Sequence, residues 1–325
     1  MSHPYALGYF SSRMQLLLFK SINEMSSSSP KTIIGNLGKA QEGERLQTPK
    51  LPEYENDIEY DIDANILAGN STFSSTRHLQ HENQSKLTLV TTALPEKPGR
   101  IEVTTPGATP WARIFKLQAF MPQTEEPKVY FLKISEGQLG RGMVEAEFES
   151  TLVLRAVSQA NVATPIVFGT LATDPESHFS LATFHCMEDR LPGMQELIEV
   201  VARIHGESAL QKEKFGFHLP TYVGPLPVNN SWCDTWEAFF TRMMRDTIRD
   251  EIAVRGESDE MSGLKEELCT KVIPRLLRPL ETEGRKIESC LVHGNLSHRN
   301  VAIHSHFLKP MFFDPCALYA HNECW

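Results

Sequence analysis

The chain has 325 residues, of which 41% are hydrophobic and 22% charged, and it carries a formal net charge of -9. This length and composition suit a globular protein with one large or two-lobed domain and a sizeable core. The negative charge, without any basic run, argues against nucleic acid as a partner. No stretch reaches the ~18 apolar residues of a membrane span, so we expect no membrane segment.

The six cysteines are scattered along the chain and form no C-x-x-C pair. Such spacing indicates reduced, mostly buried thiols of an intracellular protein and not a disulfide framework or a zinc site. We therefore expect a cytoplasmic location. A mitochondrial one stays open, because residues 1–23 include Arg13 and Lys20 but no acid. The sequence carries no indication of oligomeric state.

Residues 1–85 have the composition of a disordered extension. Serines fill positions 26–29, several glycines follow, and acids alternate with apolar residues over 53–63. Such a segment buries too little apolar surface to fold alone. The alternative is a segment that docks onto a partner or onto the folded part of the chain.

The next segment has the pattern of short strands. We expect strands at 101–103, 113–120 and 129–134, with a turn at 104–109 where Pro and Gly are adjacent. The third strand is a dense apolar run that contains Lys133. A cation in such a run is costly to desolvate unless an anion meets it.

A helix is predicted at 143–159, because apolar residues recur there at helical spacing. It carries three candidate anions for Lys133, namely Glu145, Glu147 and Glu149. Strands are expected at 162–169 and 179–185, an amphipathic helix at 195–208, and further helical segments at 262–280. A β-rich first part followed by a helical second part predicts an α/β (α+β) fold.

A polar loop near the end of the chain carries the chemistry. It contains His293, Gly294, Asn295 and Asn300, and Asp314 follows the next apolar run. In the catalytic loop of kinases, a base is followed five positions later by an Asn that holds magnesium, and a later Asp holds the metal bridging the phosphates. Asn300 and Asp314 fit the two metal positions. Asn295 stands where the Asp base is expected.

The loop from His293 to Asn300, with Phe313-Asp314-Pro315 and the segment 319–323 (Tyr-Ala-His-Asn-Glu), resembles the fructosamine kinase (ketosamine-3-kinase) family, particularly its fungal branch. The family's motifs read His-Gly-Asp-Leu-Trp-x-Gly-Asn, Phe-Asp-Pro and Tyr-x-His-x-Glu. The resemblance extends upstream to about Ile101. It implies a protein-kinase-like two-lobed fold with the N-lobe at 86–185 and the C-lobe at 186–325. Because family members continue into further helices, this C-lobe is expected to be incomplete.

By this resemblance the cofactors are ATP and Mg²⁺. Lys133 holds phosphate oxygens and pairs with Glu147, and the turn at 105–109 covers the phosphates. The adenine edge meets the main chain near three residues of the interlobe hinge, Thr183, Phe184 and His185.

The same resemblance assigns the polar loop. Asn300 and Asp314 hold Mg²⁺, for which a carboxylate and an amide oxygen are suitable donors. Asn295 faces the acceptor hydroxyl, and His293 braces the loop by hydrogen bonding. The aromatic residues Trp236, Phe239 and Phe240 border the sugar site by resemblance, although they fit an aromatic core equally well.

The implied activity is ATP-dependent phosphorylation of a ketosamine, a ribulosamine or fructosamine adduct on a protein lysine, at a sugar hydroxyl. Three positions of the loop depart from the family pattern: Asn295 replaces Asp, Ser297 replaces Trp, and Arg299 replaces Gly. An amide cannot accept the substrate's proton, and loss of a general base lowers the rate by ~10²–10⁴. Two alternatives therefore stay open, a pseudokinase or nucleotide-binding scaffold and a small-molecule kinase with another hydroxyl acceptor.

Overall fold

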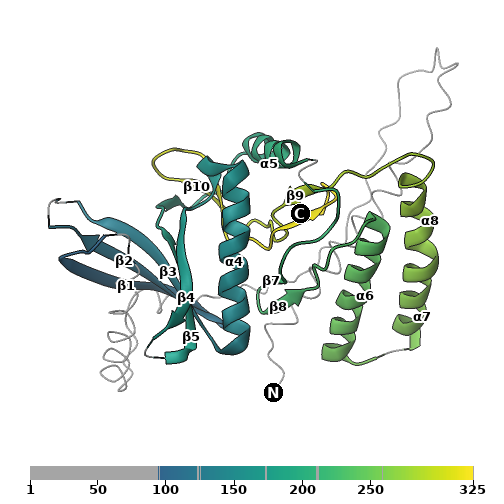
Figure 1. The fold of residues 1–325 in the computed structure, drawn as a ribbon, viewed down its shortest axis with the longest axis horizontal. Coiled ribbons are helices and arrows are strands. Elements are labelled where there is room, and N and C mark those ends of the chain that lie inside the picture. Colours follow the sequence, from purple (N-terminus) through teal and green to yellow (C-terminus); the bar gives the residue numbers. More distant parts are fainter. Residues whose placement is uncertain are drawn as a thin grey trace, which may run out of the picture.

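The computed structural model describes residues 94, 96–122, 124, 126–172, 174–209, 212–257 and 259–324. The predicted disordered extension, residues 1–85, and the faint targeting signature lie outside this range. The described chain forms a five-stranded sheet with a long helix against it, followed by a second part that combines helices with short strands (Figure 1).

The large sheet is antiparallel, and its strand order is β1-β2-β3-β5-β4. Its strands are β1 (Arg100–Thr109), β2 (Ala112–Phe120), β3 (Lys128–Glu136), β4 (Pro165–Leu171) and β5 (Asp174–Thr183). Alternate residues point to opposite faces of a strand. One face therefore collects a core that includes Leu117, Leu132 and Leu181, all almost completely buried.

The first hairpin corrects the predicted turn at 104–109. Strand β1 continues to Thr109, and the chain reverses at Pro110 and Trp111. The pairing with β2 shifts register between Thr104 and Gly107. A bulge on an edge strand accommodates a proline without breaking the ladder, which is why the Pro-Gly pair does not end the strand.

The helix packed against the sheet is α4 (Gly137–Val157), which begins well before the predicted start at Met143. Glycines at 137, 140 and 142 weaken the helical signal in its first two turns. Gly140 is needed there for packing, because a Cβ at this position would lie 2.7 Å from the carbonyl carbon of Ser135. The helix consequently starts directly against the end of β3.

The second part contains four α-helices and several short strands within the described residues. The helices are α5 (Met194–Ser208), α6 (Trp236–Arg255), α7 (Asp259–Glu267) and α8 (Ile273–Leu277), with a π-helical turn at Leu268–Val272 and a 3-10 turn at Arg278–Leu280. A further 3-10 turn, Gln159–Asn161, follows α4. The helices predicted at 195–208 and 262–280 are thus present.

Three small sheets position the polar loop. One joins β6 (Met187–Glu188), β10 (Val301–His304) and β11 (Pro310–Phe312), a second pairs β9 (Cys290–Val292) with β12 (Leu318–Ala320), and a third pairs β7 (Thr221–Val223) with β8 (Leu226–Val228). Because β9 precedes the loop and β10 follows it, both ends of the loop are fixed by strand pairing.

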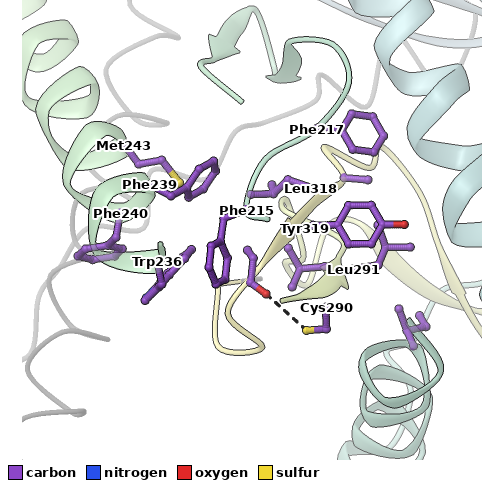
Figure 2. Packing of buried hydrophobic residues seen from close by; sticks show 14 of the residues in the cluster. Phe215, Phe217, Trp236, Phe239, Phe240, Met243, Cys290, Leu291, Leu318 and Tyr319 are labelled. Atoms are coloured by element: carbon purple, nitrogen blue, oxygen red, sulfur yellow. Dashed lines mark hydrogen bonds between the residues drawn. The ribbon is translucent and has the colours of Figure 1, made fainter. Parts of the chain in front are cut away.

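A large aromatic and aliphatic core supports these strands (Figure 2). Trp236, Phe239 and Phe240 are buried in it, and the Trp236 ring centre lies 5.5 Å from that of Phe215. Of the two predictions for these three residues, a place in the core and a place beside the sugar site, the structure supports the core. The Cys290 thiol, 3.6 Å from the carbonyl oxygen of Ala320, joins β9 to β12 at the edge of the same core.

All six cysteines lie in the described residues, and none of them forms a disulfide. Cys269, Cys290 and Cys316 are buried, whereas Cys186 is exposed. Burial raises the pKa of Cys290 to about 12, so this thiol stays protonated and unreactive at neutral pH. Among the helices of the described chain, none is long and apolar enough to cross a membrane.

Candidate active site

A buried lysine lies between two carboxylates at the centre of the site. Lys133, in β3, is only 7% exposed. Its Nζ donates to Glu147 Oε2 of α4 at 2.8 Å and to Asp314 Oδ1, which follows β11, at 2.8 Å. These contacts join the large sheet, the helix on it and the second part of the chain.

Of the three acids on α4, Glu147 is the one that contacts Lys133. Glu149 instead pairs with His218 at 3.3 Å. Glu145 lies near Tyr222, whose pKa is raised by burial and further by the charge of Glu145. Helical geometry explains this division, because residues two apart on a helix point in different directions. The geometry thus favours Glu147, which the family resemblance also pairs with Lys133.

Lys133, Glu147 and Asp314 form an ion triad with one cationic and two carboxyl groups. Burial by itself would lower the pKa of Lys133, but Asp314 and Glu147 together outweigh burial and raise that pKa above its ordinary value. Lys133 lowers the pKa of Asp314. Burial raises the pKa of Glu147, with Lys133 offsetting part of the effect. At neutral pH the lysine is protonated and Asp314 ionised, and Glu147 is the carboxylate that takes up a proton more readily.

Backbone contacts hold Asp314 beside the polar loop. The Phe313 N–H donates to the carbonyl of Asn300 at 3.0 Å, and the Cys316 N–H donates to the carbonyl of His293 at 2.9 Å. Asp314 itself has φ of 47°, in the left-handed region that non-glycine residues seldom adopt. The backbone hydrogen bonds of Phe313 and Cys316, on either side of Asp314, hold it in this conformation.

The loop requires glycine at position 294. Gly294 has φ of 72°, and a Cβ there would lie 1.9 Å from the carbonyl oxygen of Cys316. Further along, Asn300 Nδ2 donates to the carbonyl of Asn295 at 2.7 Å, and the Asn300 N–H donates to the carbonyl of Ser297 at 3.0 Å. These bonds fix the spacing of the two asparagines that the sequence singled out.

Asn295 and His293 have structural partners in this loop. Asn295 Nδ2 donates to the carbonyl of Asp314 at 3.0 Å, and the Asn295 N–H donates to His293 Nδ1 at 3.3 Å. Burial lowers the pKa of His293 to about 4, so the imidazole is neutral at physiological pH. A neutral, buried imidazole that accepts from the loop backbone fits the bracing role that the resemblance assigned to it.

The donors near Asp314 fit a magnesium ion that also binds phosphate. The Asp314 carboxylate is 52% exposed, and the backbone carbonyl of Asn300 accepts a hydrogen bond from Phe313, the residue before Asp314. The described residues contain no group of three or more His, Cys, Asp or Glu side chains placed to hold a metal ion. Mg²⁺ commonly takes one or two protein oxygens and completes its shell with water and substrate phosphates, so two donors are adequate for it.

Of the predicted hinge residues, Thr183 is the last residue of β5, and Phe184 and His185 follow it. The Thr183 N–H donates to the carbonyl of Thr164 at 2.9 Å, and the Phe184 N–H donates to the carbonyl of Val129 at 3.1 Å. The His185 ring lies between Thr183 Oγ1 at 2.9 Å and the His304 ring at 3.1 Å. Two of the three backbone N–H groups are thus engaged within the protein, and adenine recognition by this segment stays a prediction.

Sequence reasoning missed several residues that line the site. Trp111, Tyr222 and Gly224 share a small cavity of about 40 Å³ with Lys133 and Asp314. The Trp111 ring lies 3.4 Å from the position of a Cβ on Gly224, so the tip of the first hairpin meets the turn between β7 and β8. Only the Trp next to Pro110 was a usable signal; nothing local predicts that the two hairpins meet.

The other two departures from the family loop lie at the surface. Ser297 and Arg299 are both exposed. The Arg299 side chain therefore does not fill the loop interior, and the loop accommodates the residue that replaces the family's Gly.

A comparison with known proteins gives the family directly. The family model described as fructosamine kinase matches residues 115–325. A Staphylococcus aureus protein assigned as a ketoamine kinase is 27% identical over 190 residues, which cover 56% of this chain and 61% of that protein. The chloroplastic protein-ribulosamine 3-kinase of Oryza sativa subsp. japonica is 24% identical over 60% of this chain and 54% of its own length. Ketosamine-3-kinase of Mus musculus is 35% identical over 36% of each.

The chain therefore spans less than two thirds of the length of these curated relatives. Solved structures assigned as fructosamine-3-kinases share the fold. The one from Haemophilus somnus has a TM-score of 0.53 at 19% identity, covering 74% of this chain and 76% of that one. The one from Thermobifida fusca has a TM-score of 0.50 at 18% identity, covering 68% and 70%. The predicted α/β (α+β), protein-kinase-like fold is confirmed, and the chain belongs to the fructosamine kinase family.

Proposed function

We propose that the chain binds ATP with Mg²⁺ and transfers a phosphoryl group to a sugar hydroxyl of a ketosamine, a ribulosamine or fructosamine adduct on a protein lysine. The observation that carries this proposal is Lys133 held at 2.8 Å from both Glu147 and Asp314. The acceptor class is supported by the names of the curated relatives, which include a ketosamine-3-kinase and protein-ribulosamine 3-kinases.

Phosphoryl transfer depends mainly on positioning and electrostatics, because charge spreads over the oxygens of the transferred group. Lys133 would place its ammonium on phosphate oxygens while Glu147 fixes its direction. Asn300 and Asp314 would hold Mg²⁺, and that ion would neutralise charge on the phosphates. The lysine keeps its proton at all relevant pH values, because the two carboxylates raise its pKa.

Lys133, Asn295 and Asp314 line a cavity of about 40 Å³, which is smaller than a nucleotide. Nucleotide binding would therefore require the hairpin tip at Trp111 to move away from Gly224. In the closed arrangement, Lys133 occupies Asp314 Oδ1, and phosphate and metal would take over part of that contact.

Asn295 makes the proposed transfer slow. Its amide donates to the carbonyl of Asp314, and it has no basic group that could accept the proton of the acceptor hydroxyl. The loss of a general base lowers a rate by ~10²–10⁴. Proton transfer can follow a loose transition state, and for this reason we expect residual activity.

The direct test is phosphate transfer to a lysine peptide carrying a ribulosamine, with MgATP, for the wild type and for Asn295→Asp. We expect slow turnover by the wild type and an increase of ~10²–10⁴ in kcat for the variant. Asp234→Asn serves as a matched control, because Asp234 is an exposed acid paired with Lys214 outside the site.

One observation favours a second candidate, a pseudokinase or nucleotide-binding scaffold. The Asn295 side chain has a structural role, since it donates to the backbone of Asp314 at 3.0 Å. A wild type without turnover, together with an active Asn295→Asp variant, would establish this alternative. Inactivity of both toward ketosamines, with MgATP still bound, would instead indicate a small-molecule kinase with another hydroxyl acceptor.

A further inference from the structure

Two histidines join the end of the large sheet to the β10–β11 hairpin. His304, the last residue of β10, is only 8% exposed. Its Nε2 lies 3.1 Å from Nδ1 of His185, which belongs to the predicted hinge. The proposed transfer chemistry uses neither imidazole, so the contact between the two rings is left to be explained.

The hydrogen bonds around His304 specify which of its ring nitrogens carries a proton. His304 Nδ1 accepts the backbone N–H of His306 at 3.0 Å and that of Phe307 at 3.2 Å. A ring nitrogen that accepts N–H groups carries no proton, so the proton of the neutral ring is on Nε2. His304 Nε2 therefore donates to His185 Nδ1.

The same reasoning specifies the proton of His185. Because His185 Nδ1 accepts, the proton of this ring is on Nε2, which donates to Thr183 Oγ1 at 2.9 Å. The Thr183 hydroxyl oxygen also accepts the backbone N–H of Thr164 at 2.9 Å. One chain of hydrogen bonds thus runs from the turn of the β10–β11 hairpin through both imidazoles to the end of β5.

This chain fixes the hinge residue whose backbone N–H is left for a ligand. The N–H groups of Thr183 and Phe184 donate to backbone carbonyls, whereas that of His185 has no acceptor among the described residues. The edge of an adenine offers ring nitrogens that accept such a donor. Because the His185 ring is held at both of its nitrogens, the position of its backbone is restricted as well.

Protonation of either ring breaks the chain. A second proton on His185 would place an N–H against the Nε2–H of His304, and a second proton on His304 would place one against two backbone N–H groups. Burial lowers the pKa of His185, and the charges of His304 and Arg155 lower it further. At neutral pH the chain is therefore intact.

The charged groups around the pair give an imidazolium no buried counter-ion. Arg155 of α4 is held nearby by the carbonyls of Gln159 and Val162, each at 2.9 Å. Glu188, in the strand that pairs with β10, is bound to Arg190. The other charged or imidazole side chains on the neighbouring elements are cationic or exposed, and they include Lys116, Lys128, Asp189, Arg203, His306 and Lys309.

We propose that His304 is a positioning residue for the nucleotide: through His185 it holds the hinge N–H for the adenine edge, and it does so only while neither imidazole is protonated. The part of this inference that concerns the nucleotide rests on the proposed function. The chain of hydrogen bonds does not.

The first test is a set of ¹⁵N–¹H correlation spectra of the histidine rings in the full chain. At neutral pH, His185 and His304 should both show the neutral Nε2–H tautomer. On acidification both rings should change together, with a midpoint below the ordinary value of about 6.5. An Nδ1–H tautomer of either ring, or rings that titrate independently, would overturn the chain.

The second test compares the binding of MgATP and of magnesium tripolyphosphate by calorimetry. Tripolyphosphate has the phosphates and the metal ion but no adenine, so it would not need the hinge. His304→Asn keeps an acceptor near the Nδ1 position and removes the donor to His185. It should weaken MgATP binding by ~5–10-fold, which corresponds to the loss of about one hydrogen bond, and should leave tripolyphosphate binding unchanged.

Two further variants serve as controls for this comparison. His304→Gln places an amide N–H near the Nε2 position and should restore part of the affinity for MgATP. His306→Gln is the matched control on the same hairpin, because only the backbone N–H of His306 belongs to the chain. This variant should bind MgATP like the wild type.

A pH series separates positioning from a merely structural role. Between about pH 7.5 and pH 5, the affinity of the wild type for MgATP should fall by about tenfold relative to its affinity for tripolyphosphate. The double variant His185→Asn/His304→Gln has no imidazole in the chain, so the ratio of the two affinities should stay constant over this range.

Equal weakening of both ligands by His304→Asn, or an unchanged affinity for MgATP, would overturn the positioning role. If this variant does not fold, the pH series of the wild type decides, and a constant ratio of affinities overturns the role. A wild type that binds neither ligand would refute the proposed function and the positioning role with it, whereas the ring spectra would still decide the chain of hydrogen bonds.

Discussion

Replacing Lys133 with methionine tests whether the ion triad joins the parts of the protein as the structure indicates. Methionine keeps much of the side-chain volume and removes only the ammonium. The change leaves two carboxylates without their cation, and Glu147 is the more deeply placed of them, 22% exposed against 52% for Asp314. Removing one partner of a buried pair destabilises a protein by ~3–5 kcal/mol. Because Asp314 can turn toward water, we expect a loss of about 3 kcal/mol at pH 7.

The loss of stability in Lys133→Met should depend on pH in a definite direction. Burial raises the pKa of Glu147 even with Lys133 present, and removal of the cation raises it further. A carboxyl whose folded pKa exceeds its unfolded value favours folding below the unfolded pKa, and this contribution is lost as pH rises through the folded pKa. The penalty of Lys133→Met should therefore shrink between pH 7 and about pH 4.5.

Urea unfolding followed by circular dichroism measures this penalty. The double variant Lys133→Met/Glu147→Gln should recover about 1–2 kcal/mol relative to Lys133→Met alone, because it also removes the unpaired carboxylate. A loss below about 0.5 kcal/mol for Lys133→Met, typical of surface substitutions, would refute the triad. So would strictly additive effects of the two substitutions.

Other predictions address the loop and the core. Gly294→Ala should destabilise the fold by more than about 3 kcal/mol, because its Cβ would meet the carbonyl of Cys316 at 1.9 Å. The control Gly206→Ala should stabilise the fold by about 0.5–1 kcal/mol, because Gly206 is in a helix and a Cβ there meets nothing within 4 Å. Phe239→Ala should reduce the free energy of unfolding by about 3–5 kcal/mol in urea melts, since Phe239 is fully buried. In NMR titrations His293 should stay neutral down to about pH 4. Because His293 takes up a proton at a higher pH in the unfolded chain than in the folded protein, the free energy of unfolding should fall as pH drops below about 6.5. A His293 titration near pH 6.5 or a neutral Gly294→Ala would contradict these assignments.

The central residues of the site could be predicted because local rules specify them. A lysine inside an apolar strand demands a buried anion, so the sequence of β3 alone singles out Lys133. The five-residue spacing of Asn295 and Asn300 and the position of Asp314 after an apolar strand are likewise properties of short segments. The structure brings Lys133 within 2.8 Å of Asp314, although 181 residues separate them in the chain.

The features that were missed depend on contacts between distant segments. The start of α4 has glycines that lower helix propensity, and only packing of Gly140 against Ser135 explains why the helix begins there. Pro and Gly at 106–107 predicted a turn, but pairing with β2 carries the strand past them to Thr109. No local pattern indicates that Trp111 meets Gly224, and for this reason the wall of the site was not anticipated.

The most direct test of the account is thermal unfolding of the wild type and of Asp314→Ala with ATP, with and without Mg²⁺. The account predicts that MgATP stabilises the wild type by about 2.7 kcal/mol at a hundredfold excess over Kd, that ATP without Mg²⁺ stabilises it less, and that Asp314→Ala abolishes the difference between the two. Asp234→Asn, an exposed control, should behave like the wild type. Stabilisation that is independent of Mg²⁺, or a full Mg²⁺ effect in Asp314→Ala, would contradict the claim that the phosphates and their metal ion are held between Lys133 and Asp314.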